Sequence, residues 1–418
     1  MKTGQPETGT VLKKQIEYIY RRTKRMKSEV VILSCESYEE ELVYSTLKKG
    51  IALLGGWETF LKKEEKILLK PNLVRKTEVE RAVITHPAVV KGIVRLLKEE
   101  GYVHLSCGDS CGVGSAKKVM EGTGMDQMLE DYGVTIVDFN EGSTVSYPQG
   151  HTAKEFFLAK PVQETDALIN LCKMKTHALE RVTGGVKNLY GCISGLHKAK
   201  GHTKYTNADI FARQLIDLNQ LIKPRFCVMD GIVAMDGNGP TSGDPVKMKV
   251  LLLGNDPVAI DSVYCHLVHL DPQMVPTNVH GETMGLGTWR EENIRLLTDG
   301  GEITMQEAVE RFGNPDFNVD RKKQRGNLWN RFNNGFLRYF QKKPYVEADK
   351  CKKCGVCVEA CPVEGKALQF KNGRRKPPVY NYHKCIRCFC CQEMCPHKAI
   401  RLSEKVNSAR KLKFHTED

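Results

Sequence analysis

Two cysteine runs near the C-terminal end constrain this chain more than any other feature. Both read C-x2-C-x2-C-x3-C followed by proline, the first at residues 351–361 and the second at 385–395. Thiolates two residues apart on a tight loop can bind three corners of one 4Fe-4S cube, while the fourth cysteine points to another cube. The spacing therefore predicts two clusters with two ligand sets. One set is Cys351, Cys354, Cys357 and Cys395, and the other is Cys385, Cys388, Cys391 and Cys361.

The cysteine-rich segment is an internal duplication. Each cysteine recurs 34 positions later, and GKALQF (365–370) is echoed by HKAIRL (397–402). A repeat of this length predicts a pseudo-twofold fold of about sixty residues. Asn372-Gly373, between two short alternating runs, predicts a tight type I′ hairpin.

Zinc ribbons are the alternative interpretation of so many cysteines. Their ligands come as two separated C-x2-C pairs around one ion, which the two unbroken runs do not match. Cys390 lies beside a ligand without disturbing the spacing, and we interpret it as a spectator. Residues 345–403 resemble the bacterial two-cluster ferredoxins, with eight ligands in register. That resemblance implies transfer of single electrons at low potential, to or from a redox partner protein.

The remaining composition sets the expected environment. Sixteen cysteines could form disulfides, but nine of them lie between residues 351 and 395 at metal-ligand spacing. There is no apolar stretch of about 18 residues, and the N-terminal residues lack the apolar core of a signal peptide. We therefore expect a cytoplasmic protein. Much of the net charge of +13 lies in basic runs at 13–27 and 321–343. Such runs could contact nucleic acid, anionic lipid or an acidic partner protein, and we interpret them as solvated surface.

Residues 28–300 alternate short apolar runs with longer amphipathic ones, which predicts a doubly wound α/β domain with a mostly parallel sheet. The expected strands are EVVILS, KILLK, VHLSC, VTIVDF, ALINLC, RFCVMD and KVLLLG.

We divide the chain into a basic N-terminal segment (1–27), the α/β domain (28–300), a basic amphipathic linker (301–344), the ferredoxin module (345–403) and a basic tail (404–418). In the linker, Trp329, Phe332, Phe336 and Phe340 share one helical face, which we expect to pack against the protein.

Polar side chains follow several of the expected strands. Ligands of such folds bind where strands end, and converging lysines, amides and glycines suit a small anion such as a carboxylate or phosphate. The glycine-rich loop at 234–245 is a further candidate for this site. The predicted ligand-binding residues are Lys70, Asn72, Asp109, Ser110, Lys173, Lys187 and Asn188, and the predicted catalytic residues are His86, Lys175 and His177.

Several of these residues have a purely structural alternative. His86-Pro87 can begin a helix, Asp109-Ser110 can cap one, and Asp256-Pro257 is expected to do so. The loop at 234–245 can be a plain turn. Cysteines of the α/β domain are expected in its core, with Cys107 and Cys111 kept as candidates for a redox or metal role.

Seven motifs together resemble the family of uncharacterised iron-sulfur proteins called domain of unknown function three-six-two, often fused to a C-terminal ferredoxin module. The motifs are KPNLV (70–74), THP (85–87), GDS (108–110), KMKTH (173–177), TGGVKNLYG (183–191), DGIVAMDGNGPTSG (230–243) and NDPVAIDSV (255–263). The resemblance implies this architecture over nearly the whole chain. It implies no substrate.

Two functions remain open from the sequence. In the first, the module passes electrons to a small anion in the α/β domain, because tethering raises the local concentration of the donor to about the millimolar range. In the second, the protein is a non-catalytic carrier or adaptor that docks a partner redox enzyme. The sequence shows no flavin, nicotinamide or nucleophilic-thiol signature, which favours the second.

Overall fold

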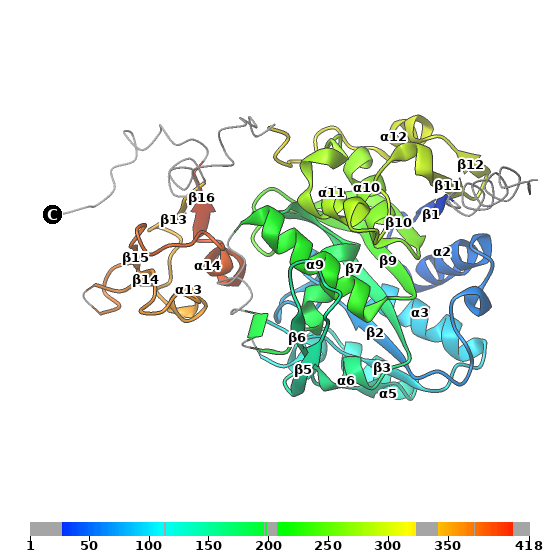
Figure 1. Cartoon of the computed structure of the whole chain (residues 1–418), viewed down its shortest axis with the longest axis horizontal. Helices are drawn as coiled ribbons and strands as arrows, with labels where there is room; N and C mark the ends of the chain where they lie inside the picture. Colours follow the sequence, from blue (N-terminus) through cyan, green and yellow to red (C-terminus); the bar gives the residue numbers. More distant parts are fainter. Residues whose placement is uncertain are drawn as a thin grey trace, which may run out of the picture.

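A computed structural model describes residues 27–112, 114–195, 197–198, 207–322, 342–371 and 373–403 (Figure 1). An α/β domain with a mostly parallel sheet precedes a small cysteine-rich module, as the sequence predicts. The basic N-terminal segment, the aromatic face of the linker and the basic tail lie outside the described residues. Within the described ranges, no helix combines the length and apolarity needed to cross a bilayer.

The α/β domain is built on one ten-stranded sheet. Its strands are β1 (Ser28–Ser34), β2 (Ile67–Pro71), β3 (Leu105–Cys107), β4 (Thr135–Ile136), β7 (Ala167–His177), β8 (Arg181–Thr183), β9 (Phe226–Asp236), β10 (Asp244–Gly254), β11 (Ile294–Thr298) and β12 (Gly301–Ile303). Their order is β12-β11-β1-β10-β9-β7-β2-β3-β4, with β8 paired to β7. Strands β9, β7, β2, β3 and β4 run parallel, whereas β10 lies antiparallel to β9 because a short loop joins the two. A separate hairpin is formed by β5 (Gly142–Ser146) and β6 (Glu155–Ala159).

Helices cover both faces of this sheet, so the domain is doubly wound. Side chains alternate along β1: Val31 and Leu33 enter one core, and Val30 and Ile32 enter the other. The helices of the first face are α2 (Glu40–Leu53), α3 (Pro87–Glu99), α4 (Ala116–Glu121) and α5 (Met125–Asp131). Those of the second face are α6 (Lys160–Gln163), α7 (Gly185–Asn188), α9 (Ala208–Ile222), α10 (Pro257–Leu267), α11 (Pro276–Thr283) and α12 (Met305–Phe312).

Two boundaries differ from those expected. The α/β domain does not end at residue 300, because β12 pairs with β11 and Phe312 of α12 is buried in the second core. Strand β7 is also longer than ALINLC and ends at His177. Lys173, Lys175 and His177 therefore lie within a central strand, not after it. The sequence did not show this because charged side chains are rarely placed in a buried strand.

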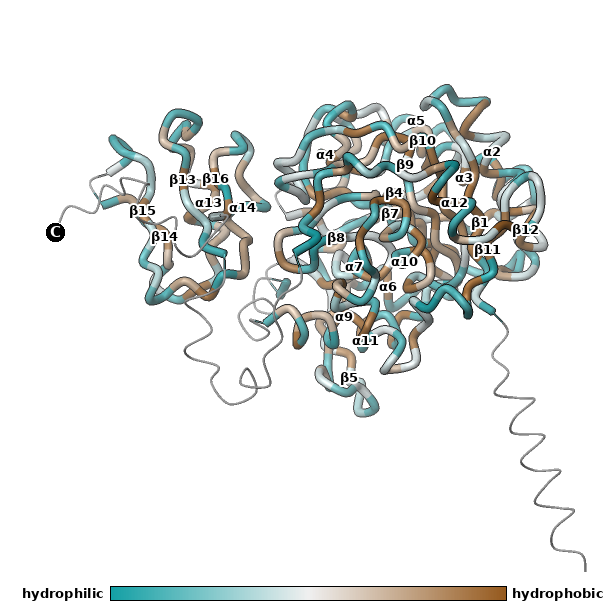
Figure 2. Tube along the Cα trace, turned by 90° about the horizontal axis from the view of Figure 1, so that it is seen from above, coloured by the Kyte–Doolittle hydropathy of each residue, from teal (hydrophilic) through white to brown (hydrophobic). Residues whose placement is uncertain are grey.

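The module has two similar halves. Strand β13 (Pro344–Val346) pairs with β16 (Ile400–Leu402), and β14 (Leu368–Gln369) pairs with β15 (Val379–Tyr380). The small sheet expected around Asn372-Gly373 is therefore present, with Gln369 paired to Val379, while Asn372 itself lies outside the described residues. Two short helices complete the module, α13 (Val356–Glu359) and α14 (Cys390–Met394). In Figures 1 and 2, α14 is the helix of the module nearest the α/β domain.

Candidate functional site

Two cavities of the module are lined by cysteines. Each cavity has four of them, and one cysteine in each comes from the other run. Cys351, Cys354, Cys357 and Cys395 line the first, and Cys361, Cys385, Cys388 and Cys391 line the second. These are the same two sets of four that the spacing gives, and their role as ligands stays a prediction. Cys390 lines neither cavity.

The surroundings of these sulfurs fit iron-sulfur cubes. The backbone N–H groups of Ala367 and Ala399 donate to Cys361 Sγ at 3.2 Å and Cys395 Sγ at 3.3 Å, at equivalent places in the two halves. Such N–H to sulfur bonds help to set cluster potentials. In the described part of the chain, no three His, Cys, Asp or Glu side chains converge on a single ion. A tetrahedral zinc site needs that convergence, whereas a cube takes one thiolate at each corner.

Two of the predicted anion-binding lysines already have a buried partner. Lys70 Nζ lies 2.8 Å from Asp109 Oδ1, and Lys173 Nζ lies 2.7 Å from Asp230 Oδ2. Asp109 also accepts from the backbone N–H of Leu73, while Ser115 caps α4. Lys70 and Lys173 are therefore neutralised within the protein, and their role in binding an anion stays a prediction. The alternative that Asp109 caps a helix is wrong, because Ser115 does so.

Three other predicted residues have structural contacts. His86 caps α3, since its Nδ1 accepts from the N–H of Ala88, and its ring stacks on Tyr38 at 3.6 Å. Burial lowers the pKa of His86 to about 4. Asn188 Nδ2 donates to Asn170 Oδ1, and Ser110 Oγ accepts from the N–H of Gly195.

The structural alternatives hold for Asp256, which begins a helix, and for Cys107, which lies in the core. Asp256 accepts from two backbone N–H groups at the start of α10. Cys107 is fully buried in the first core. Burial, with Asp109 nearby, raises the pKa of Cys111 to about 12. Neither thiol supplies a reactive thiolate near neutral pH.

Lys175 differs from the paired lysines. Its buried Nζ contacts the carbonyl oxygen of Val83 at 2.9 Å and Asn72 Oδ1 at 3.3 Å, and no described carboxylate pairs with it. Burial, followed by the charges of Lys187 and Lys173, lowers the pKa of Lys175 to about 7. This amine can therefore give or take a proton near neutral pH.

His177 joins the two domains. Its Nδ1 accepts from the N–H groups of Leu179 and Glu180, each at 3.1 Å, so the ring proton is on Nε2. That Nε2 lies 2.9 Å from Glu393 Oε1 of α14. Burial, followed by Lys187, lowers the pKa of His177 to about 4, which leaves the ring neutral.

Glu180 was missed by sequence reasoning. It is fully buried, and neither carboxylate oxygen has a hydrogen-bond partner within the described ranges. Burial raises its pKa to about 8, although Lys187 opposes that change. The available signal was one acidic residue placed three positions after the basic KMKTH motif. We call Lys175, His177, Glu180 and Lys187 the Lys175 cluster.

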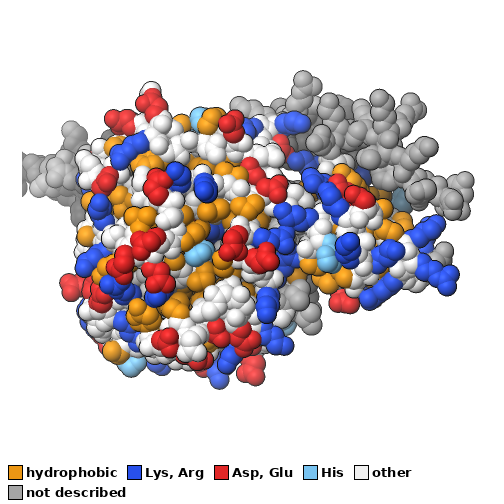
Figure 3. All heavy atoms as spheres, turned by 180° about the vertical axis from the view of Figure 1, so that it is seen from behind, with side chains coloured by type: hydrophobic (Ala, Val, Ile, Leu, Met, Phe, Trp, Pro, Cys, Tyr) orange, Lys and Arg blue, Asp and Glu red, His pale blue; other side chains and the backbone are white. Residues whose placement is uncertain are grey.

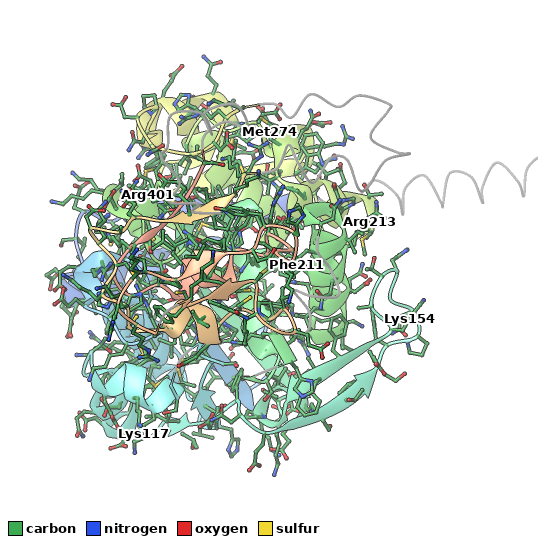
Figure 4. All side chains as sticks on the ribbon, turned by 90° about the vertical axis from the view of Figure 1, so that its left-hand side faces the viewer. Lys117, Lys154, Phe211, Arg213, Met274 and Arg401 are labelled. Atoms are coloured by element: carbon green, nitrogen blue, oxygen red, sulfur yellow. The ribbon has the colours of Figure 1, made fainter. Side chains whose placement is uncertain are left out.

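The loop at residues 237–243 is where the module docks. Gln392 Nε2 donates to the carbonyl oxygens of Asn238 and Gly239, each at 2.9 Å. Lys398 Nζ donates to the carbonyl oxygen of Gly243 at 2.8 Å. Figure 4 shows the module in front of the α/β domain. The sequence did not predict this contact with the module, because it depends on tertiary structure. The role of the loop in binding a small ligand stays a prediction.

These observations define a two-domain iron-sulfur protein, in which a cysteine module docks on a doubly wound α/β domain. The chain belongs to the family described as "Domain of unknown function (DUF362)". That model matches residues 67–266, and a 4Fe-4S dicluster domain matches residues 343–396. The second match shows that the module binds iron-sulfur clusters.

One curated relative is the thylakoid-associated protein sll1697 of Synechocystis sp. It is 35% identical over 281 residues, which are 67% of this chain and 87% of the relative. Two solved structures are also similar. The lactate racemase apoprotein of Thermoanaerobacterium thermosaccharolyticum is 15% identical with a TM-score of 0.37, and a Thermotoga maritima protein is 14% identical with a TM-score of 0.36. Each match covers 56% of this chain, and 56% and 60% of the two solved chains, which is less than two thirds of their lengths.

Proposed function

We propose that this chain transfers electrons through two 4Fe-4S clusters and uses them to oxidise or reduce a small anion bound at the Lys175 cluster. The observation that carries the proposal is the position of α14. Cys391 and Cys395, which line different cavities, flank Glu393, which lies 2.9 Å from His177 Nε2. One helix thus links both sets of cysteines to the Lys175 cluster.

The residues of the cluster have distinct roles in this proposal. Lys175 and Lys187 supply the positive charge that a carboxylate or phosphate needs. Lys175 can also move a proton, since its pKa of about 7 makes both protonation states available. His177 holds α14 in place through Glu393. When bound, the clusters supply or accept one electron at a time. Because cluster thiolates must stay reduced, we place the protein in the cytoplasm.

One observation favours the alternative, a carrier or adaptor without its own substrate. Lys70 and Lys173 are neutralised by Asp109 and Asp230. Two of the four lysines predicted to bind the anion therefore form ion pairs within the α/β domain instead. In the alternative, the α/β domain would only hold the module and a partner enzyme.

The two functions are separated by an anion screen on the anaerobic full-length protein. Calorimetry measures binding of phosphate and short carboxylates, and absorbance then follows reoxidation of the reduced clusters. We expect at least one anion to bind and reoxidise the clusters, and Lys175→Met/Lys187→Met to weaken that binding about tenfold or more. Lys62→Met, which changes an exposed residue ahead of β2, is the control. If no anion binds, or if the double variant binds equally well, the carrier function is supported instead.

A further inference from the structure

The module surface is strongly basic. Residues 342–403 contain fourteen Lys and Arg against five Asp and Glu. Figure 3 shows many of these basic side chains on the module. Six of them flank Cys354 in the sequence, donate to it, or lie between Phe370 and Pro378, two residues that line its cavity. We call this group the Cys354 rim: Lys352, Lys353, Lys371, Arg374, Arg375 and Lys376.

The rim surrounds the most accessible of the eight cysteines. Cys354 is exposed, whereas all four cysteines of the second cavity are buried. Lys352 and Lys353 line the cavity of Cys354, and Arg374 Nη1 donates to the carbonyl oxygen of Cys354 at 3.1 Å. Electron transfer between proteins weakens steeply with distance. The edge at Cys354 is therefore the place where a partner can come nearest to a cluster.

The rim charges are not neutralised within the protein. Among the described residues, Lys352, Lys371, Arg375 and Lys376 are exposed and make no ion pair. Other basic residues of the module do have partners: Lys350 and Arg401 pair with Glu347. Unpaired charge of one sign attracts a partner of the opposite sign and accelerates its docking.

We infer that the Cys354 rim docks an acidic carrier protein that exchanges one electron with the adjacent cluster. This inference rests on the proposed electron-transfer function and adds the place and chemistry of the partner. In the reducing direction, the carrier loses one electron and the cluster gains it, and no atom is transferred. Nucleic acid or anionic lipid would match the charge, but neither accounts for the exposed cysteine at the centre of the rim.

The test uses reduced flavodoxin, an acidic one-electron carrier whose semiquinone absorbs differently from an iron-sulfur cluster. Stopped-flow absorbance follows semiquinone formation when anaerobic, oxidised full-length protein is added. The variant is Lys371→Glu/Arg375→Glu/Lys376→Glu, none of which contacts a cavity cysteine. The matched control is Lys62→Glu/Lys66→Glu/Lys154→Glu, three exposed residues of the α/β domain. Lys154 is marked in Figure 4.

We expect the second-order rate constant to fall about tenfold or more in the rim variant at low salt, and the wild-type rate to fall as salt is added. The control variant should react like the wild type. Equal rates in both variants would overturn the inference, as would loss of anionic-vesicle binding in the rim variant with an unchanged electron-transfer rate. If a small reductant reduces the clusters but flavodoxin does not, the docking inference fails and electron transfer stands. If no cluster forms, the proposed function itself fails.

Discussion

The two domains depend on different sources of stability. The α/β domain buries large apolar side chains on both faces of its sheet. The two small cores of the module instead consist largely of cysteines, including Cys357, Cys391 and Cys395 in one and Cys361 and Cys385 in the other. Small domains of this kind need a metal or another staple to be stable. The module should therefore fold only with its clusters, whereas the α/β domain should not need them.

The two domains also differ in how they use charge. The α/β domain buries charged residues and neutralises some of them in pairs, as in Lys70 with Asp109 and Lys173 with Asp230. The module keeps much of its charge exposed and unpaired around Cys354. This difference matches the two proposals, which place a ligand site inside the α/β domain and a partner surface on the module.

The largest expected effect follows removal of one cluster ligand. Cys391→Ser takes a thiolate from the second cavity, so we expect iron to fall from about eight to about four atoms per chain or fewer and the module to lose part of its ordered structure. Iron and sulfide analysis with circular dichroism measures both. Cys390→Ser, in which the changed residue lines neither cavity, is the control. Equal iron loss in both variants would contradict the ligand assignment.

Breaking a buried ion pair should affect only the α/β domain. Lys173→Met leaves Asp230 buried without its cation, which should lower the free energy of unfolding of this domain by about 3–5 kcal/mol. Urea unfolding measures the change, while the iron content should stay constant. Arg95→Ala, which removes exposed pairs with Glu41 and Glu99, should lower the free energy of unfolding far less, because solvent screens exposed charges. An equal loss of unfolding free energy in both variants would show that the buried pair contributes no more to stability than an exposed pair.

A smaller effect is expected at the contact between the domains. Gln392→Ala removes the donor to the carbonyl oxygens of Asn238 and Gly239, so we expect docking to weaken by about 1–3 kcal/mol. Small-angle X-ray scattering should then show a larger radius of gyration. Gln369→Ala is the control, because that exposed amide bonds within the module. An unchanged radius in Gln392→Ala would mean that the loop at 237–243 does not hold the module.

The last expected effect is a change in how stability depends on pH. The pKa of Lys175 is about 7 in the folded chain and 10.5 ordinarily, so between these values the unfolded chain binds more protons. The wild-type free energy of unfolding should therefore gain a rising contribution from pH 7 to about 10.5. Lys175→Met should remove that contribution, whereas Lys62→Met should not. Parallel pH profiles for wild type and Lys175→Met, from urea unfolding, would contradict the lowered pKa.

The sequence predicted the fold class and the division of the cysteines because both depend on local patterns. Apolar runs follow strand and helix periods, and ligand spacing reflects the geometry of a tight loop. The α/β site depends on contacts between distant segments, which spacing does not encode. Lys173 and Asp230 are 57 positions apart, and Gln392 is 154 positions from Asn238. The sequence did not predict Glu180, because a single acidic residue forms no motif or repeat that would mark it as buried.

The metal content of the module tests the proposed electron transfer most directly. The measurement is iron, sulfide and zinc analysis of anaerobically purified full-length protein, combined with electron paramagnetic resonance after reduction with dithionite. We predict about eight iron and eight sulfide per chain and a signal from two interacting reduced clusters. Zinc in place of iron, or a colourless protein without a signal, would contradict the account.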